Sequence, residues 1–239
     1  MAEFVKKKKV AIVGTAPSSW QLAPFGDPEW EIWGISAMHQ HLPRWDRWFE
    51  FHDLDIFVDL DNGPMRPFKA AYEGHLEWLG ACKGPLYVKE LDPRVPHGKL
   101  FPWQELVTKF GRGGFTNSIS WLVAFAIKEG YEEIGIWGVD MAQESEYRHQ
   151  KPGCYFFMGW AQGAGIKMTI PEQSDLFKIR ALYGFEDNYS EFHAKCDVRK
   201  RELTERIRAA DLQKEKFEKE GVYLRGAIND IDYFINNWN

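Results

Sequence analysis

Polar residues and glycines follow the short apolar stretches of this 239-residue chain, at the points where the stretches end. Side chains of these types can accept protons or bind phosphate oxygens. In an open parallel sheet, ligands bind at the carboxyl ends of the strands. We therefore expect one site to gather these residues, which are Gly14, Thr15, Ala16, Pro17, Ser18, Ser19, Ser36, His52, Asp53, Asp140, Glu172 and Ser174.

Three of these residues carry side chains that could act as a catalytic base. His52 and Asp53 follow the stretch RWFEF, and Asp140 follows EIGIWGV. Asp140 could instead hold a metal ion, a ribose hydroxyl or only a neighbouring loop. Five other histidines show no partner pattern, and we expect each to be structural or on the surface; they are His39, His41, His75, His97 and His193.

The first loop, in VAIVGTAPSSW (residues 10–20), has two interpretations. Gly14 would let the backbone approach a nucleotide, with Thr15, Ala16, Pro17 and Ser18 around it and helix amides favouring an anion. The loop matches neither GxGxxG nor GxxxxGK[ST], so it could equally be a plain turn between a strand and a helix.

A second glycine-rich loop, GRGGFTNS (residues 111–118), precedes a helical pattern. Thr116, Asn117 and Ser118 with the free amides of the helix start could form a cradle for phosphate oxygens. The alternative is a capped helix after a flexible loop. Asn117 or Thr116 would cap the helix in either case.

The segment from 137 to 177 holds the remaining candidates. Tyr147, Arg148 and His149 could stabilise a phosphate, and Trp160 could stack on a base or sugar ring. Glu172 and Ser174 follow the last strand and complete the candidate contacts with substrate or phosphate. The alternative is a solvated loop beside a structural Asp140.

The elements that must position these residues alternate between strands and helices, which favours a Rossmann-like, doubly wound α/β fold with a mainly parallel sheet. We expect strands at 9–13, 31–36, 47–52, 84–89, 133–139 and 166–170, and helices at 69–79 and 117–129. Two long segments, 91–115 and 141–165, are rich in Gly and Pro or lack periodicity, and we expect them to be irregular.

The chain changes character near residue 190. Leu203, Ile207, Ala210 and Phe217 form a helical stripe amid dense mixed charge, and Gly221 interrupts it. We predict a helical hairpin here, as a C-terminal extension over 189–239 of a nucleotide-binding domain over 1–188. The hairpin could pack on the core or make the chain a homo-oligomer.

Composition narrows the class of protein. Net charge is −5, which gives no reason to expect general nucleic-acid binding. The three cysteines, Cys82, Cys154 and Cys196, lack the spacing of a zinc site, and we expect no metal centre. No apolar run reaches 18 residues, so we expect no membrane contact and a cytoplasmic protein.

Three segments resemble one enzyme superfamily. They are AIVGTAPSSW, NSISWLVAFAIKEGYEEIGIWGVD (117–140) and CYFFMGWAQGAGIKMTIPEQS (154–174). Together they are similar to the sialyltransferase-like fold of bacterial CMP-sialic acid transferases (glycosyltransferase family 42) and of archaeal 6-hydroxymethylpterin diphosphokinases. The chain also resembles bacteriophage proteins.

The resemblance implies a nucleotide lying across Gly14 to Ser18, Ser36, His52 and Thr116 to Ser118. It also implies that tyrosines assist the leaving phosphate, with Tyr147 and Tyr155 as counterparts. The family's general base is a histidine, and the matching stretch here offers Trp160 or Cys154, neither of which can replace it.

We therefore carry three hypotheses. The first is a glycosyltransferase that uses a CMP- or UDP-linked sugar donor, with Mg²⁺ not required and His52, Asp53 or Asp140 as the base. The second is a pterin-type diphosphokinase in which Asp140, with Glu144 or Asp53, holds Mg²⁺. The third is a nucleotide-binding assembly protein without catalysis.

Overall fold

The computed structural model describes residues 8–141, 145–176 and 188–237, with side chains for 8–141, 149–176 and 195–237. The chain divides into two compact units, Met1–Lys178 and Ile179–Asn239. Each unit is described by itself.

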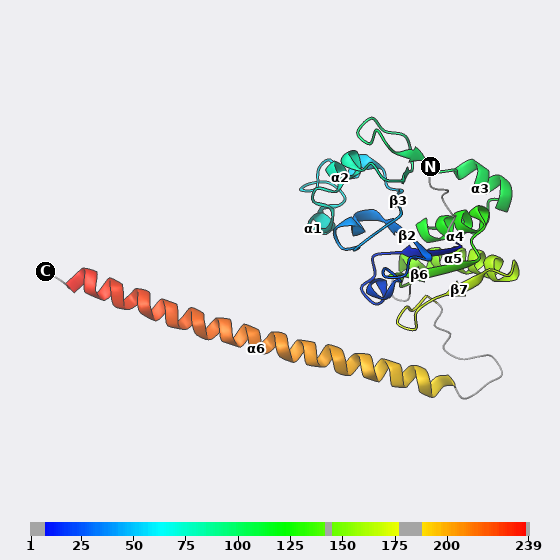
Figure 1. The fold of residues 1–239 in the computed structure, drawn as a ribbon. Coiled ribbons are helices and arrows are strands. Elements are labelled where there is room, and N and C mark those ends of the chain that lie inside the picture. Colours follow the sequence, from blue (N-terminus) through cyan, green and yellow to red (C-terminus); the bar gives the residue numbers. More distant parts are fainter. Residues whose placement is uncertain (1–7, 142–144, 177–187, 238–239) are drawn as a thin grey trace. The chain divides into compact units, whose positions relative to one another are not determined.

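The first unit is built on a seven-stranded sheet in the order β5-β4-β3-β2-β1-β6-β7 (Figure 1). Every strand pair is parallel, as the sequence predicts. The order reverses between β1 and β6, which makes the sheet doubly wound. The strands are β1 (Lys9–Val13), β2 (Trp30–Ile35), β3 (Arg47–Glu50), β4 (Leu86–Val88), β5 (Lys99–Leu100), β6 (Glu133–Trp137) and β7 (Lys167–Thr169).

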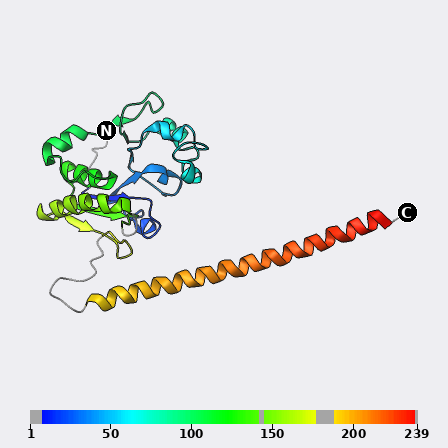
Figure 2. The same cartoon turned by 180° about the vertical axis from the view of Figure 1, so that it is seen from behind.

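Helices cover both faces of the sheet, and the alternation of strand side chains supplies a core to each (Figures 1 and 2). Val10 and Ile12 of β1 join the core beneath α3 (Trp103–Phe110), α4 (Ser118–Glu129) and α5 (Ser145–Gly163). Ala11 and Val13 join the core on the other face. That face carries η1 (Trp20–Leu22), η2 (Ser36–Gln40), η3 (Leu54–Phe57), η4 (Arg66–Phe68), α1 (Lys69–Tyr72) and α2 (His75–Ala81).

The best-predicted helix is α4. Asn117 is its N-cap and forms a capping box with Ser120, because each side chain accepts a hydrogen bond from the other residue's backbone amide. Gly130 ends the helix in the left-handed conformation, with φ 78°. The predicted helix over 69–79 is interrupted, since Gly74 at φ 71° separates α1 from α2.

Both segments expected to be irregular contain helices. The 91–115 segment holds β5 and α3, and α3 buries Leu106 and Phe110 one turn apart. The 141–165 segment holds α5, which contains Pro152 and buries Cys154, Phe157, Met158 and Ala161. Helical spacing of these apolar residues, packed against α4, outweighs the poor local propensity.

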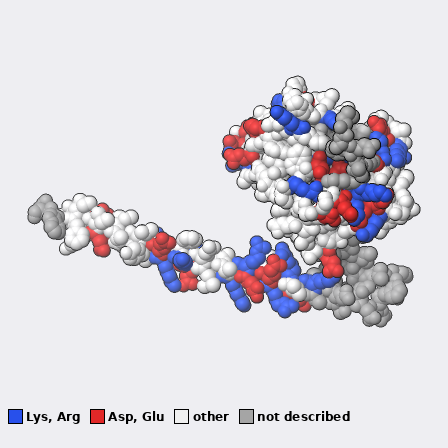
Figure 3. Space-filling view, in the orientation of Figure 1, with Lys and Arg blue, Asp and Glu red and all other residues white. Residues whose placement is uncertain are grey.

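The predicted C-terminal hairpin is wrong. The second unit contains one uninterrupted helix, α6 (Asn188–Asn237), of 50 residues. Gly221 lies inside the helix, where a glycine costs only about 1 kcal/mol relative to alanine and supplies no turn by itself. Figure 3 shows that charged side chains gather on the first part of α6 and are sparser toward its C-terminal end.

Candidate functional site

A buried carboxylate lies between two histidines at the end of β3. Glu50 is fully buried, and one of its oxygens, Oε1, lies 2.6 Å from Nδ1 of His52. The other, Oε2, lies 2.7 Å from Nε2 of His75, which is also fully buried. The backbone amide of His52 donates to Oε1 of Glu50 as well, at 2.9 Å. Both carboxylate oxygens are therefore paired, as a buried charge requires.

The pairing changes the proton affinities of these groups. Burial alone would raise the pKa of Glu50, but hydrogen bonds from His52 and His75 outweigh it and lower the pKa to about 2. The hydrogen bond to Glu50 raises the pKa of His52 above its ordinary value of 6.5, against the opposing effect of burial. Glu50 is thus a fixed negative charge at neutral pH.

His52 has the geometry of a general base. Its side chain is 41% exposed, and Nδ1 faces Glu50. A carboxylate at Nδ1 favours the tautomer that carries the proton there and leaves the Nε2 lone pair as the proton acceptor. Within the described part of the chain, Nε2 makes no hydrogen bond, so it can receive a proton from a ligand.

Aromatic rings fix the rest of this cluster. His39 stacks on Trp78 at a centroid distance of 4.2 Å, and its Nδ1 lies 3.2 Å from Nδ1 of His75. Burial, followed by the nearby His75 and His41, lowers the pKa of His39 to about 4. His75, which showed no partner pattern in the sequence, therefore bonds to Glu50, and His39 packs against His75.

The backbone of Ser36 is strained beside this cluster. Ser36 follows β2 with φ 51°, the one non-glycine residue with positive φ among those the structure describes. Its carbonyl accepts from the indole of Trp48 at 3.2 Å. Strain of this kind is held only where surrounding contacts determine the conformation, and it is frequent at functional sites.

A cavity of about 650 Å³ opens between the ends of β3 and β4 and the start of α4. It is shallow and largely open to solvent, and its volume falls within the range of ligand sites. The indole of Trp103 donates to the carbonyl of Lys89 at 3.0 Å, and the Lys89 amide donates to the carbonyl of Glu50 at 3.0 Å. The lining residues are Phe51, Lys89, Glu90, Leu100, Trp103, Phe115, Thr116, Asn117, Ser118 and Trp121.

His52 lies next to this cavity. A smaller hollow of about 60 Å³ is lined by His52 and Asp53 together with Lys89 and Glu90, and the last two also line the large cavity. The side chains of Lys89 and Glu90 form an ion pair at 3.6 Å. Lys89 and Glu90 therefore form the border between the hollow that holds His52 and the large cavity.

The helix start predicted to cradle phosphate is partly occupied. The hydroxyl of Thr116 and the amide of Asn117 both donate to the carbonyl of Gln150, each at 2.7 Å. The Asn117 side-chain oxygen also accepts from the amide of Ser120. Ser118 is half-buried and lines the cavity. Of the three predicted side chains, Ser118 is the one whose hydroxyl makes no hydrogen bond in the described part of the chain.

The glycine in the first loop has a packing role. A Cβ on Gly14 would lie 2.5 Å from the carbonyl oxygen of Gly138, and the amide of Ala16 donates to that same oxygen at 2.7 Å. Ser19 is buried and accepts from the amide of Gly138. We expected Gly14 to let a nucleotide come close to the backbone, but here the loop after β6 lies against Gly14. Thr15 and Pro17 are exposed and Ser18 is half-buried, so their contact with a ligand stays a prediction.

The two predicted carboxylate bases bond to backbone amides. Asp53 is exposed and is the N-cap of η3, because its side chain accepts a hydrogen bond from the backbone amide of Asp55. Asp140 accepts from the amide of Asp175 at 3.2 Å. Ser174 is buried and donates to the carbonyl of Val139, so it ties the loop after β7 to β6. These contacts are structural, and a catalytic role for Asp53 or Asp140 stays a prediction.

Of the remaining predicted contacts, those whose side chains the structure describes do not line the cavity. The side chains of Tyr147 and Arg148, and all of Glu144, lie outside the described residues. His149 and Glu172 are exposed. Trp160 is 42% exposed and lies edge-on to Phe110 rather than on the cavity wall. The buried thiol of Cys154 has its pKa raised to about 12 by burial, so it is a poor nucleophile.

Sequence reasoning missed Glu50, Lys89 and the aromatic wall formed by Trp103 and Trp121. One signal was present, because Glu50 is a charged residue inside the apolar stretch RWFEF. Nothing local to Trp103 marks it as part of a site, since its segment was expected to be irregular.

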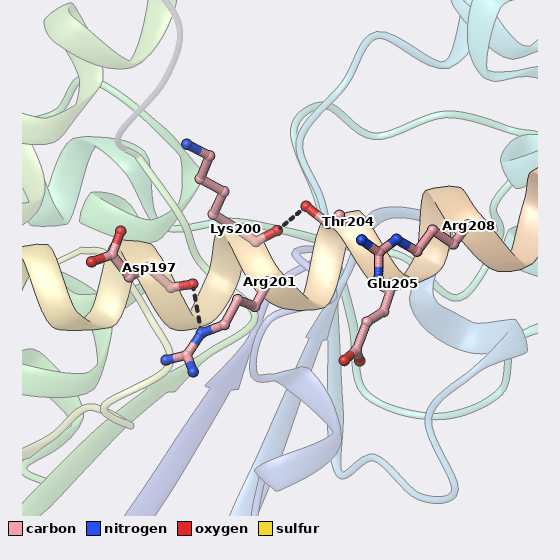
Figure 4. Close-up of a pocket in the computed structure, with 6 residues that line it drawn as sticks. All are labelled: Asp197, Lys200, Arg201, Thr204, Glu205 and Arg208. Carbon is pink, nitrogen blue, oxygen red and sulfur yellow. Dashed lines mark hydrogen bonds between the residues drawn. The ribbon is translucent and has the colours of Figure 1, made fainter.

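A hollow also runs along α6, and Figure 4 shows its lining residues, which are Asp197, Lys200, Arg201, Thr204, Glu205 and Arg208. All six belong to one helix, and two of their bonds run along it, from Thr204 to the carbonyl of Lys200 and from Arg201 to that of Asp197. A single helix face does not enclose a ligand, and we assign no site there.

Two features are absent from the part of the chain that the structure describes. No group of three or more His, Cys, Asp or Glu residues in that part of the chain is arranged to hold a metal ion. Over the same residues, no helix has the length and apolar character needed to cross a membrane.

No protein-family model and no curated protein sequence matches the chain. Among solved structures, the sialyltransferase CstII from Campylobacter jejuni with the substrate analogue CMP-3FNeuAc is similar, at 14% identity and a TM-score of 0.43, over 68% of this chain and 79% of that chain. The sialyltransferase CST-II with a trisaccharide acceptor and CMP is similar at 14% identity and a TM-score of 0.41, over 68% of this chain and 80% of that chain. An alpha-2,3-sialyltransferase from Campylobacter jejuni in apo form is similar at 13% identity and a TM-score of 0.37, over 68% of this chain and 74% of that chain. The likeness is remote, so we rest the functional proposal on contacts within this chain.

Proposed function

We propose that this chain is a glycosyltransferase that uses a nucleotide-linked sugar, with His52 as the base that activates the acceptor hydroxyl. The observation that carries the proposal is the His52–Glu50 pair, which places a half-exposed imidazole next to a cavity at the carboxyl ends of parallel strands. Parallel α/β sheets bind their ligands at this edge.

The cavity suits a nucleotide. Trp103 and Trp121 supply aromatic surface for a flat base, and Lys89 supplies a cation for phosphate. The start of α4 adds backbone amides and the hydroxyl of Ser118, which favour an anion. We propose a CMP- or UDP-linked donor with its phosphate between Lys89 and Ser118. The predicted contacts from Thr15, Ser18 and Ser36 would extend this site along the strand ends.

The transfer step follows from these positions. Nε2 of His52 takes the proton of the acceptor hydroxyl as its oxygen bonds to the anomeric carbon of the sugar. The bond from that carbon to the donor phosphate breaks, and the electron pair leaves on the phosphate. Glu50 stabilises the imidazolium formed at His52, while Lys89 and the α4 amides stabilise the leaving phosphate. No step requires a metal ion.

The proposal accounts for one departure from the family that the sequence resembles. The 154–160 stretch lacks the family's histidine, and the positions offered there are the buried Cys154 and the exposed Trp160. His52, on a different strand end, would supply the imidazole instead. The pterin diphosphokinase link, a bacteriophage origin and a cytoplasmic location stay predictions.

A thermal-shift panel with CMP, UDP, ADP and ATP, each with and without Mg²⁺, tests the donor class. A ligand that binds the folded state at a hundred times its Kd adds about 2.7 kcal/mol to the free energy of unfolding. We expect a rise in Tm with CMP or UDP that Mg²⁺ does not change. A rise with ATP that requires Mg²⁺ would favour the diphosphokinase alternative, and no rise with any nucleotide would contradict both.

A variant pair tests the base. We expect His52→Gln to lower kcat for sugar transfer by roughly 10²- to 10⁴-fold, the usual contribution of a general base, and to keep the nucleotide-induced rise in Tm. His97→Gln, at an exposed histidine that lines neither hollow, should leave kcat unchanged. Equal activity of the two variants would exclude His52 as the base.

A further inference from the structure

The surface of α6 carries more apolar area than a solvated helix needs. Every residue from 195 to 237 is exposed except Gly221, which is partly buried. Ile207 is 61% exposed, Phe217 is 63% exposed and Ile235 is 71% exposed. The ion pairs along the helix, such as Lys219–Glu215 at 2.6 Å, lie on its surface and add little stability. A helix of this length gains most of its stability by packing an apolar face against a partner.

Apolar residues occupy eight of ten positions that repeat at alternating spacings of four and three, and Lys214 and Gly221 occupy the other two. Successive positions are Leu203, Ile207, Ala210, Lys214, Phe217, Gly221, Leu224, Ile228, Ile231 and Ile235. Such a heptad repeat places all ten on one stripe, which we call the seam, and underlies a left-handed coiled coil. In heptad notation, Leu203 and Leu224 are d positions, while Ile207 and Ile228 are a positions.

The length of the seam argues against an occupant within the same chain. At 1.5 Å per residue, the 50 residues of α6 span about 75 Å. A compact unit of the size of Met1–Lys178 has a radius of gyration of roughly 16 Å and is roughly 40 Å across. The seam from Leu203 to Ile235 takes up about 48 Å of this length, and the curved surface of a compact unit roughly 40 Å across does not follow a straight seam from end to end. A helix of equal length is the partner that covers all of it.

The charges beside the seam fit a second copy of this helix. In a parallel, in-register pair, each g residue faces the e residue five positions later on the other helix. Arg206 then meets the partner's Asp211, and Glu220 meets the partner's Arg225. Symmetry gives each attraction twice. The remaining pairs, such as Gln213 with the partner's Glu218, bring no like charges together.

The antiparallel arrangement is less favourable. When two antiparallel helices overlap along the whole seam, e faces e and g faces g. Glu218 would then lie opposite the partner's Glu218, and Glu220 opposite the partner's Glu220. These two repulsions oppose the two attractions between Asp211 and Arg225 that the same overlap creates, whereas the parallel pair has four such attractions and one repulsion, between the two Lys214 side chains.

We propose that α6 forms a parallel, in-register, two-stranded coiled coil with α6 of a second copy of this chain. Isoleucine at a positions with leucine at d positions favours two strands over three or four. Leu203 with Ile207 and Leu224 with Ile228 follow this pattern, whereas Ile231 at d, between Ile228 and Ile235 at a, does not. Lys214 at an a position lowers stability and opposes misaligned registers. The coiled coil would join two copies of the sheet-containing unit.

Light scattering on the full chain tests the dimer. The expected mass is twice the 27.9 kDa of one chain. We expect Leu224→Asp to shift the mass toward one chain at micromolar concentration. Leu212→Asp is the matched control, because Leu212 lies at an f position, away from the seam. In the single chain Leu224 is 54% exposed and Leu212 is 67% exposed, so without a dimer the two variants should behave alike.

A native cysteine tests the orientation. Cys196 is exposed and lies seven residues before Leu203, at the preceding d position. A parallel pair brings the two Cys196 thiols together, and an antiparallel pair separates them by most of the helix length. Diamide, which takes up the two thiol hydrogens, should then give a dimer of twice the mass on a non-reducing gel, and Cys196→Ser should abolish it.

A monomer at all concentrations would overturn the proposal. So would a trimer or tetramer, or equal loss of the dimer in Leu224→Asp and Leu212→Asp. A dimer that diamide does not cross-link would overturn the parallel register. None of these readouts depends on nucleotide binding or sugar transfer.

Discussion

Glu50 bears a negative charge in a fully buried position, which is costly unless partners satisfy it. His52 and His75 supply those partners from the same strand end and from α2. Replacing one partner would leave an uncompensated buried charge, so the arrangement is stable only as a unit. We interpret it as a device that orients His52 and raises its proton affinity.

The pH profile of sugar transfer should report this arrangement. Only neutral His52 can accept a proton, and its pKa is raised above 6.5 by Glu50, so kcat/KM should rise with pH through a value above 6.5. Glu50→Gln removes the charge and should move this rise to lower pH, with a lower maximal rate. Glu77→Gln, on the exposed side of α2, should leave the profile unchanged. A rise at the same pH in Glu50→Gln would show that His52 does not act as the base.

The loops after β1 and β6 are fixed by direct contact between two glycines. Gly138 has φ 65°, and a Cβ there would lie 2.4 Å from the carbonyl oxygen of Gly14. The amide of Gly14 in turn donates to the carbonyl of Trp137 at 2.8 Å. This contact sets the start of the predicted nucleotide loop relative to the sheet.

Gly138→Ala should therefore be strongly destabilising. A non-glycine residue at positive φ costs about 1–3 kcal/mol, and the clash with the Gly14 backbone adds to this. Gly159→Ala is the control, because Gly159 lies on the exposed side of α5 with open space around its Cα, and alanine favours a helix by up to about 1 kcal/mol. Urea unfolding of both variants measures the difference, and equal midpoints would contradict this account of the loop contact.

At the scale of the whole molecule, the sheet-containing unit is stabilised by its own buried core, whereas α6 depends on packing against a partner in the proposed dimer. The sheet-containing unit buries aromatic residues on both faces, including Trp33 and Trp48, which are fully buried. The helix α6 has no such core of its own. Its stability in the proposed dimer comes from a second chain, so it depends on protein concentration.

Circular dichroism at 222 nm should separate the two contributions. We expect the melting of α6 to move to higher temperature as protein concentration rises, while the transition of the sheet-containing unit, followed by tryptophan fluorescence, stays fixed. Leu224→Asp should lower the α6 transition and remove its concentration dependence. If both transitions are independent of concentration in the unaltered chain, α6 is stabilised within a single molecule.

Local patterns in the sequence were sufficient to predict the elements in which the apolar periodicity begins and ends at residues that favour the end of a strand or helix. The strands β1, β2, β3 and β6 and the helix α4 with Asn117 and Gly130 at its ends follow from spacing alone, and so does the parallel order of strand and helix. The polar residues at the strand ends, including His52, were also predictable. These features are local, because the residues that define them are neighbours in the chain.

Only the tertiary structure decided the features that depend on distant contacts. The helix α5 forms despite Pro152, because Phe157 and Ala161 are buried against α4. Glu50 gains its second histidine from a residue 25 positions away. Gly14 is required by Gly138, which lies in the loop after β6, more than a hundred residues later. Such contacts leave no periodic signal in the sequence, since each is set by how the elements pack rather than by the residues beside it. The hairpin was mispredicted for the same reason, because a glycine ends a helix only where the following chain has a contact that turns it.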